Sequence, residues 1–162
     1  MEIAVISDTH LPRGPRRLPD PCIERLQAAD LILHAGDLMT LPVLRELEAF
    51  GPVVAVHGNV DDAEVRAALP ASAAVEAGGA TIALTHDAGA ARGRLERLRR
   101  RFPQADAVVF GHSHIPLLEQ SPDGFQIFNP GSPTERRRAP RHTMGMARVN
   151  EGRVSFELIP LG

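Results

Sequence analysis

Five short apolar segments of this chain each lead directly into residues that can bind a metal ion. The clearest is Ala107–Phe110, which is followed by Gly111-His112-Ser113-His114. Strand side chains alternate with a period of two, so the two histidines can point the same way, and neutral histidine is the commonest protein metal ligand. Taken alone, the motif also describes an ordinary pair of turn histidines. The other four segments end in the same chemistry, at Asp8 and His10, at Asp37, at Asn59 and at His86. Because ligands gather outside the carboxyl ends of strands in open α/β sheets, we expect these seven side chains to meet at one edge.

The first half of the chain alternates apolar strand segments with helical segments. This order predicts parallel strands joined by right-handed crossovers. The expected strands are Ile3–Ile6, Leu31–Leu33 and Val53–Val56, and the expected helices are Cys22–Ala29, Leu41–Phe50 and a short one from Asp61 or Asp62 to Leu69. Leu11–Pro21 is rich in proline and arginine, which excludes a regular helix or a central strand. We expect this loop to form a wall of the site.

The second half is dominated by hairpin signals. Gly78-Gly79 is typical of a two-residue hairpin turn, and Ser121-Pro122-Asp123-Gly124 suits another tight turn. The expected strands are Ala73–Ala77, Ala80–Leu84, Ala107–Phe110, Pro116–Gln120, Phe125–Asn129, Thr143–Val149 and Arg153–Ile159, with one helix at Arg92–Phe102. The chain is therefore predicted to be a single α/β domain over residues 1–162, with two buried sheets packed face to face and helices outside.

Composition narrows the class of protein. A content of 43% hydrophobic and 23% charged residues is ordinary for a globular domain of 162 residues. The formal net charge of −2 provides no basic field for a nucleic-acid partner. Cys22 is the only cysteine, so no internal disulfide can form, and the sequence shows neither a signal peptide nor an apolar run long enough for a membrane span. We expect a cytoplasmic protein.

Seven candidate ligands are too many for one tetrahedral zinc ion. They fit two metal ions that share a bridging carboxylate, and mixed imidazole and oxygen ligation suits Mn, Fe, Ni or Zn better than Ca or Mg alone. Two divalent ions, two aspartates and a bridging hydroxide leave such a centre with a net charge near +1, which favours an anionic substrate. The centre would also lower the pKa of its water towards about 7 and so create a nucleophile for in-line attack on a phosphate ester.

The combined motifs resemble the calcineurin-like metallophosphoesterase superfamily, and most closely its small YfcE-type phosphodiesterases. The resemblance rests on Asp8-Thr9-His10, Gly36-Asp37, Gly58-Asn59-Val60-Asp61, His86, Gly111-His112-Ser113-His114 and Asn129-Pro130-Gly131-Ser132. It implies a four-layer α/β/β/α sandwich and hydrolysis of phosphodiester bonds by a metal-bridging hydroxide, with Mn²⁺ as the preferred ion and Fe, Ni or Zn as alternatives. It implies that Asp8, His10 and His114 hold one metal, that Asn59, His86 and His112 hold the other, and that Asp37 bridges both. The catalytic set would be Asp8, Asp37, Asn59 and His86.

Two positions depart from the family pattern. Many larger relatives have a histidine where this chain has Val60, so protonation of the leaving group lacks an obvious donor and good leaving groups should be preferred. Relatives usually have glycine at Asp87, which here either orients His86 or caps a turn.

The roles of several polar residues stay open in the sequence. His34 is either a support for the site or a buried, hydrogen-bonded histidine, and His57 is a weaker ligand candidate. His142 is expected at the surface. Arg136-Arg137-Arg138 either reaches the mouth of the site or forms a solvated loop.

Two other function classes compete with a small-molecule phosphodiesterase. One is a protein-interaction scaffold resembling the eukaryotic retromer subunit of the same fold, which predicts eroded ligand positions, whereas all seven are filled here. The other is a nuclease, which would need a basic groove lined with aromatic residues, and the chain has no Trp or Tyr. The expected partner is a small phosphodiester or nucleotide-like substrate, without membrane or nucleic acid, and a homo-oligomer is compatible with the sequence.

Overall fold

A computed structural model describes all 162 residues of the chain. In chain order the elements are β1 (Glu2–Ile6), α1 (Asp20–Ala28), β2 (Leu31–His34), α2 (Leu41–Phe50), β3 (Val53–Ala55), α3 (Ala63–Ala68), β4 (Ser72–Ala77), β5 (Ala80–Thr85), α4 (Arg94–Arg101), β6 (Ala107–Val109), β7 (Leu117–Gln120), β8 (Gln126–Asn129), β9 (Thr143–Asn150) and β10 (Arg153–Pro160). The α2 helix has the predicted bounds. The α1 helix begins two residues earlier than expected, because Asp20 and Pro21 form its first turn. Proline is tolerated there, since N–H groups of the first turn have no hydrogen-bond partner within the helix.

Two five-stranded mixed sheets make up the centre of the molecule. The first has the order β10-β9-β1-β2-β3, and the second has the order β4-β5-β6-β8-β7. In the first sheet β1, β2 and β3 run parallel, and the β9–β10 hairpin from the end of the chain pairs with β1 in antiparallel fashion. The three predicted hairpins of the second half are present. However, β5, β6 and β8 pair in parallel, which the hairpin signals do not predict.

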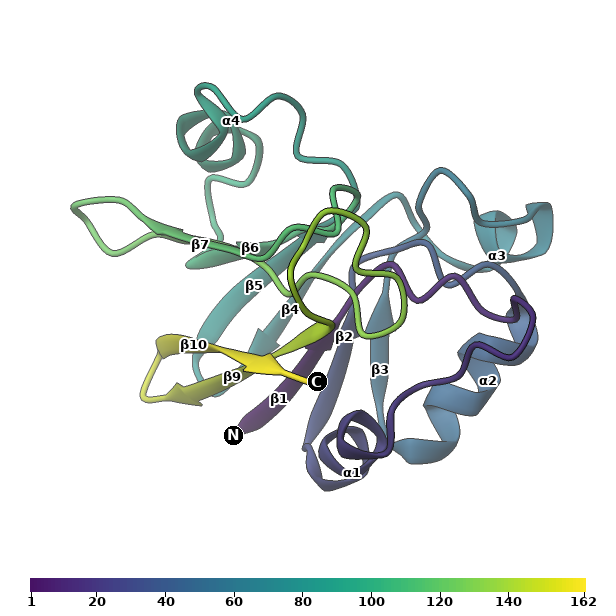
Figure 1. Ribbon diagram of the computed structural model, residues 1–162. Coiled ribbons are helices and arrows are strands. Elements are labelled where there is room, and N and C mark those ends of the chain that lie inside the picture. The colour runs from purple at the N-terminus through teal and green to yellow at the C-terminus, as the bar shows by residue number, and fades with distance from the viewer.

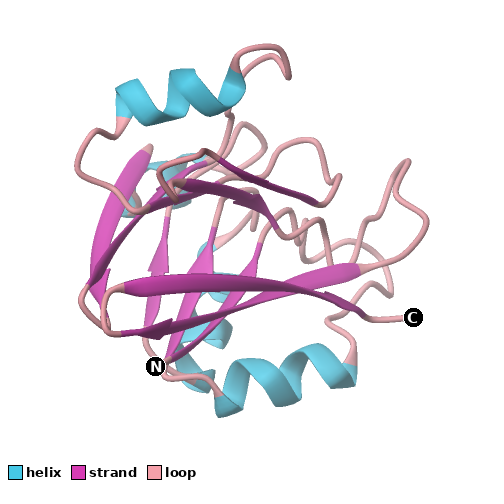
Figure 2. Cartoon of the chain, turned by 90° about the vertical axis from the view of Figure 1, so that its left-hand side faces the viewer, coloured by secondary structure: helices cyan, strands magenta, loops and turns pink.

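The two sheets face each other, with α1 and α2 covering the first and α4 covering the second (Figures 1 and 2). This is the α/β/β/α sandwich that the sequence predicts. Strand alternation explains how β1 contributes to two apolar layers: Ile3 and Val5 pack between the sheets, while Ala4 and Ile6 pack against the helices. On the opposite side, Leu98 of α4 covers the outer face of the second sheet.

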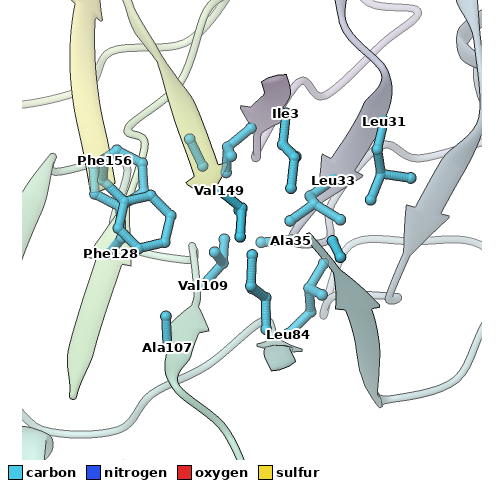
Figure 3. Close-up of a cluster of buried hydrophobic side chains, with 14 of the residues drawn as sticks. Ile3, Leu31, Leu33, Ala35, Leu84, Ala107, Val109, Phe128, Val149 and Phe156 are labelled. Atoms are coloured by element: carbon cyan, nitrogen blue, oxygen red, sulfur yellow. The ribbon is translucent and has the colours of Figure 1, made fainter. Parts of the chain in front are cut away.

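The layer between the sheets is a continuous apolar core. Figure 3 shows Phe128 of the second sheet beside Phe156 of the first, and their rings stack with centroids 4.5 Å apart. Val149 and Val109 meet the same cluster from β9 and β6. None of the helices combines the length and the apolar character that a membrane span requires.

Candidate metal centre

The seven predicted ligands all lie in loops at the carboxyl ends of strands. Loops of the first sheet supply four of them: Asp8 and His10 after β1, Asp37 after β2, and Asn59 after β3. Loops of the second sheet supply the other three: His86 after β5, and His112 and His114 after β6. These loops gather at one end of the sandwich (Figure 1). The site therefore spans both sheets.

One group of ligand atoms belongs to Asp8, His10 and His114, and these atoms lie within 4.8 Å of one another. His114 Nε2 is 3.5 Å from Asp8 Oδ1, and the rings of His10 and His114 meet edge to face with centroids 5.0 Å apart. All three residues are buried, so the group forms the floor of the site.

A second group joins Asp8, Asp37 and His86 within the same distance. His86 Nε2 is 3.1 Å from Asp37 Oδ2, and the same oxygen is 3.5 Å from His10 Nε2 of the first group. The Asp37 carboxylate therefore faces a histidine of each group, as a bridging carboxylate would, while Asp8 is a member of both groups.

Asn59 and His112 complete the convergence at the solvent side. Asn59 Oδ1 is 3.0 Å from His86 Nε2 and 3.1 Å from His112 Nδ1. Both residues are exposed, whereas the other five are buried. The structure thus separates a buried floor from an accessible mouth.

Each of the three buried histidines directs Nε2 at the centre; Nδ1 is hydrogen-bonded in His86 and His114 and lies near a carboxylate in His10. His86 Nδ1 hydrogen-bonds the Ala35 carbonyl at 2.8 Å, His114 Nδ1 hydrogen-bonds the Glu135 carbonyl, and His10 Nδ1 is 3.2 Å from the Glu135 carboxylate. A hydrogen bond at one ring nitrogen fixes the tautomer that leaves a lone pair on the other.

Two buried atoms on this floor have no hydrogen-bond partner, namely His10 Nε2 and His114 Nε2. Buried polar atoms are nearly always paired, so two unpaired imidazole nitrogens facing carboxylates are suited to a cationic partner. Burial lowers the pKa of His114 to about 4, which keeps this ring neutral and able to donate its lone pair. The donor set of imidazole, carboxylate and amide therefore fits borderline divalent cations.

The two aspartates differ in their electrostatics. Burial raises the pKa of Asp8 to about 6. Burial also acts to raise the pKa of Asp37, but the ring nitrogens of His10 and His86 outweigh it and hold that pKa well below its usual range. In the other direction, the carboxylates of Asp37 and Asp8 outweigh burial and raise the pKa of His86.

The backbone at the site is unusual as well. Asp8, His10, Asp37, His112 and His114 all have left-handed backbones, with φ between 47° and 72°. Such conformations cost about 1–3 kcal/mol in a residue other than glycine, and they cluster at functional sites. His112 and His114 follow β6 in this irregular loop, where His114 joins the first group and His112 lies beside Asn59 outside both groups. The expected strand alternation is therefore not what directs them.

Close packing explains two of the motif glycines. A Cβ atom at Gly58 would overlap the Asp37 carboxylate, and one at Gly111 would overlap the Ser7 hydroxyl beside Asp8. Only glycine allows these backbones to approach the ligands so closely.

Asp61 is a supporting residue that the sequence reading leaves as a candidate helix cap. Its carboxylate accepts the backbone N–H groups of Asp37 at 3.0 Å, Met39 at 2.6 Å and Gly58 at 2.6 Å. Asp62 is the cap of α3 instead, because its side chain accepts the Val65 N–H. The position of Asp61 within the Gly58-Asn59-Val60-Asp61 motif is the one sequence signal for this role.

Residues 129–135 form a second support, and their first four residues are the Asn129-Pro130-Gly131-Ser132 motif of the sequence. Ser132 Oγ donates to the Asp8 carbonyl at 2.8 Å, and Asn129 Nδ2 donates to the Gly111 carbonyl at 3.1 Å. Glu135 holds both His10 and His114, as described above. No sequence signal points to Glu135.

The structure decides between the alternatives for the remaining polar residues. Asp87 is exposed and caps a turn by accepting the Gly89 N–H at 2.8 Å, so it does not orient His86. His34 is fully buried between the Thr9 hydroxyl and the Gly36 N–H, and burial lowers its pKa to about 3. His57 belongs to neither ligand group. His142 is half-buried and lines a hollow at the surface between loop 11–19 and loop 133–142.

Comparison with known proteins identifies the family. A family model described as the calcineurin-like phosphoesterase superfamily domain matches residues 1–152. A probable metallophosphoesterase of Methanothermobacter thermautotrophicus is 34% identical over 164 residues, covering 100% of this chain and 94% of that protein.

Solved structures share the fold. A Thermotoga maritima protein solved by NMR is 31% identical, with 99% of each chain covered and a TM-score of 0.76. Vps29 of Entamoeba histolytica, crystallised with Zn²⁺, is 22% identical, with both chains fully covered and a TM-score of 0.78, a likeness that shows the fold alone. Motifs, sandwich and comparisons agree, and the chain belongs to the calcineurin-like phosphoesterase superfamily.

Proposed function

We propose that this protein is a divalent-metal-dependent phosphodiesterase with a dinuclear centre. The observation that carries the proposal is the convergence of seven donor side chains from both sheets, with two buried imidazole nitrogens unpaired at their centre. Asp8, His10 and His114 would hold one ion, Asn59, His86 and His112 would hold the other, and Asp37 would contact both. When bound, the two ions would polarise the phosphate oxygens and acidify a water molecule that serves as the nucleophile.

The residues of the chain determine what such a centre can bind. Asp8 and Asp37 neutralise half of the charge of two divalent ions, while Asn59 and the histidines add none. The positive excess favours an anionic substrate, and a phosphodiester carries a single negative charge. Asn59 and His112 at the exposed edge leave the mouth open to a phosphate group.

The leaving group meets a surface without a proton donor. Val60 is 38% exposed at the mouth, and its backbone N–H is already donated to Asp37 Oδ1 at 2.9 Å. An apolar side chain cannot protonate a departing alkoxide. The chain is therefore suited to diesters whose leaving group departs as a stable anion.

The finer features of the function are also proposals. Mn²⁺ is the proposed ion, because mixed imidazole and carboxylate ligation accommodates it, with Fe, Ni and Zn as alternatives. The proposed substrate is small and nucleotide-like, since loops 11–19 and 133–142 border a hollow of about 410 Å³ lined by Arg13, Arg16 and Arg17. A cytoplasmic location agrees with a single buried cysteine.

The test is hydrolysis of bis(p-nitrophenyl) phosphate by protein loaded with Mn²⁺, together with its metal content. Wild-type protein is expected to bind two ions per chain and to hydrolyse the diester. Asp37→Ala should lose at least one ion and about 100-fold or more of the activity, because the carboxylate that faces a histidine of each group is removed. Asp87→Ala is the matched control, since this exposed aspartate lies beside His86 without contacting the site. Equal activity in the two variants, or no hydrolysis by the loaded wild type, would refute the proposal.

A protein-interaction scaffold is the second candidate. The Vps29 structures fit this fold as well, and Leu118 and Leu158 are 50% and 40% exposed where they border a small apolar hollow. Exposed apolar surface of this kind marks interaction sites in other proteins. The diester assay separates the two candidates, because a scaffold requires no hydrolysis; metal content alone does not, since Vps29 of Entamoeba histolytica was crystallised with Zn²⁺.

A further inference from the structure

The three consecutive arginines Arg136, Arg137 and Arg138 have different surroundings, although all are exposed. Arg136 closes its own loop by donating to the Ala139 carbonyl at 2.9 Å. Arg138 makes no hydrogen bond or ion pair. Arg137 extends to the metal centre, where its Nη1 lies 3.5 Å from the carbonyl oxygen of His112. Only the middle arginine of the triplet therefore reaches the mouth of the site.

Arg137 is also the cation at this mouth without a carboxylate partner. Arg13 and Arg16, on the neighbouring loop, both pair with Glu135, at 3.5 and 3.6 Å. No such pair forms at Arg137, so most of its five N–H donors face solvent beside His112. A guanidinium group in this state is a ready partner for phosphate oxygens, which it can bind in bidentate fashion.

The backbone of Arg137 shares the unusual conformation of the site. Its φ is 48°, in the same left-handed region as Asp8, His10, Asp37, His112 and His114. The Arg136 bond to Ala139 and the Glu135 contacts to two floor histidines hold the loop on both sides of it. A strained residue persists only where its surroundings enforce it, and here they enforce a side chain directed at the mouth.

We propose that Arg137 binds a non-bridging phosphate oxygen of the substrate at the mouth of the metal centre. This inference rests on the proposed function. Under this proposal, the loop at residues 133–142 provides a charged contact on the side of the phosphate that faces away from the buried candidate ligands.

The test uses full-length protein loaded with Mn²⁺ and two probes, bis(p-nitrophenyl) phosphate as substrate and inorganic phosphate as ligand. Arg137→Ala should lower kcat/KM by about 10- to 100-fold, the range for a lost hydrogen bond between charged groups, and should weaken phosphate binding by a similar factor. Arg137→Lys should retain part of both, because it keeps the charge without the bidentate fork. Arg138→Ala is the control and should stay within about twofold of wild type.

A glycine variant separates binding from structure. Arg137→Gly should lose as much kcat/KM as the alanine variant, but glycine accepts φ near 48° without strain, so Tm should equal or exceed that of wild type. Glu151→Gly, at a turn with φ 49° beyond the far end of β9, should relieve strain in the same way and leave activity unchanged.

Three results would overturn the inference. The first is equal phosphate binding in Arg137→Ala and Arg138→Ala, and the second is a loss of activity that follows a loss of bound Mn²⁺ or of Tm. The third is a wild type that binds Mn²⁺ but not phosphate. Failure of the proposed function is distinct, because it would appear as wild-type protein that neither binds Mn²⁺ nor hydrolyses the diester, whatever residue stands at position 137.

Discussion

Replacing Asp61 with asparagine tests how the loops that carry Asp37 and Asn59 are held together. The Asp61 carboxylate accepts three backbone N–H groups, two through Oδ2 and one through Oδ1, and the side chain is 5% exposed. Asparagine keeps one oxygen and places an NH₂ group where the other was. At least one N–H then faces a donor, and an unsatisfied buried donor costs about 1–3 kcal/mol.

We therefore expect Asp61→Asn to lower the free energy of unfolding by about 1–3 kcal/mol, and Tm by about 2–4 °C for each kcal/mol. The measurement is urea unfolding in the presence of a chelator, so that metal binding adds nothing to stability. Because the bonded N–H groups belong to Asp37 and Gly58, Mn²⁺ affinity should also fall, by the 10- to 100-fold typical of residues that support metal ligands.

The adjacent aspartate supplies the matched control. Asp62 caps α3 through one bond to the Val65 N–H at 2.9 Å, and asparagine caps helices about as well as aspartate. Asp62→Asn should therefore change stability by less than about 0.5 kcal/mol and leave Mn²⁺ affinity unchanged. If the two variants behave alike in both measurements, Asp61 does not hold the loops as argued.

Three further predictions concern pH, the leaving group and the cysteine. His34 is neutral in the folded protein, with its pKa lowered to about 3, so the unfolded chain binds more protons below pH 6.5. The free energy of unfolding should therefore fall as pH decreases from 6.5 towards 3, by up to about 1.4 kcal/mol per pH unit. The same slope in His34→Gln as in the wild type would contradict this. Because Val60 offers no proton, rates on aryl diesters should far exceed those on alkyl diesters, and Val60→His should narrow the gap; equal rates on both substrates with wild-type protein would refute the argument. Burial raises the pKa of Cys22 to about 12, so a thiol reagent should label it only after unfolding in urea, and rapid labelling of native protein at pH 8 would show that the thiol is accessible.

The place of each candidate ligand could be predicted from the sequence because each follows an apolar strand, and the register of a strand with a buried face is strongly constrained. Alternation in β1 buries Ile3 and Val5 on one face, and the same strand delivers Asp8 to its carboxyl end. The arrangement of two facing sheets with helices outside could be predicted because the first half of the chain alternates strands with helices and the second half is rich in hairpin turns. Local patterns carry this information directly.

The remaining features depend on contacts between segments far apart in the chain. Glu135 meets His10 from 125 residues away, and Ser132 meets the Asp8 carbonyl from 124 residues away. No periodicity encodes such pairs. The parallel pairing of β6 with β5 and β8 is also invisible, because hairpin signals describe only consecutive strands. The direction of His112 toward Asn59 comes from a left-handed backbone that sequence propensity does not favour outside glycine, asparagine and aspartate.

Because the candidate ligands are distributed over both sheets, bound cations would hold the two sheets together. The loops of the first sheet hold Asp8, His10, Asp37 and Asn59, and those of the second hold His86, His112 and His114. Ions that bind only when the two halves are aligned favour the docked arrangement by mass action. The affinity for the ions would then report how well the two sheets are aligned. A substitution at the Phe128–Phe156 stack, which contains no candidate ligand, should weaken ion binding under conditions where the protein is still folded.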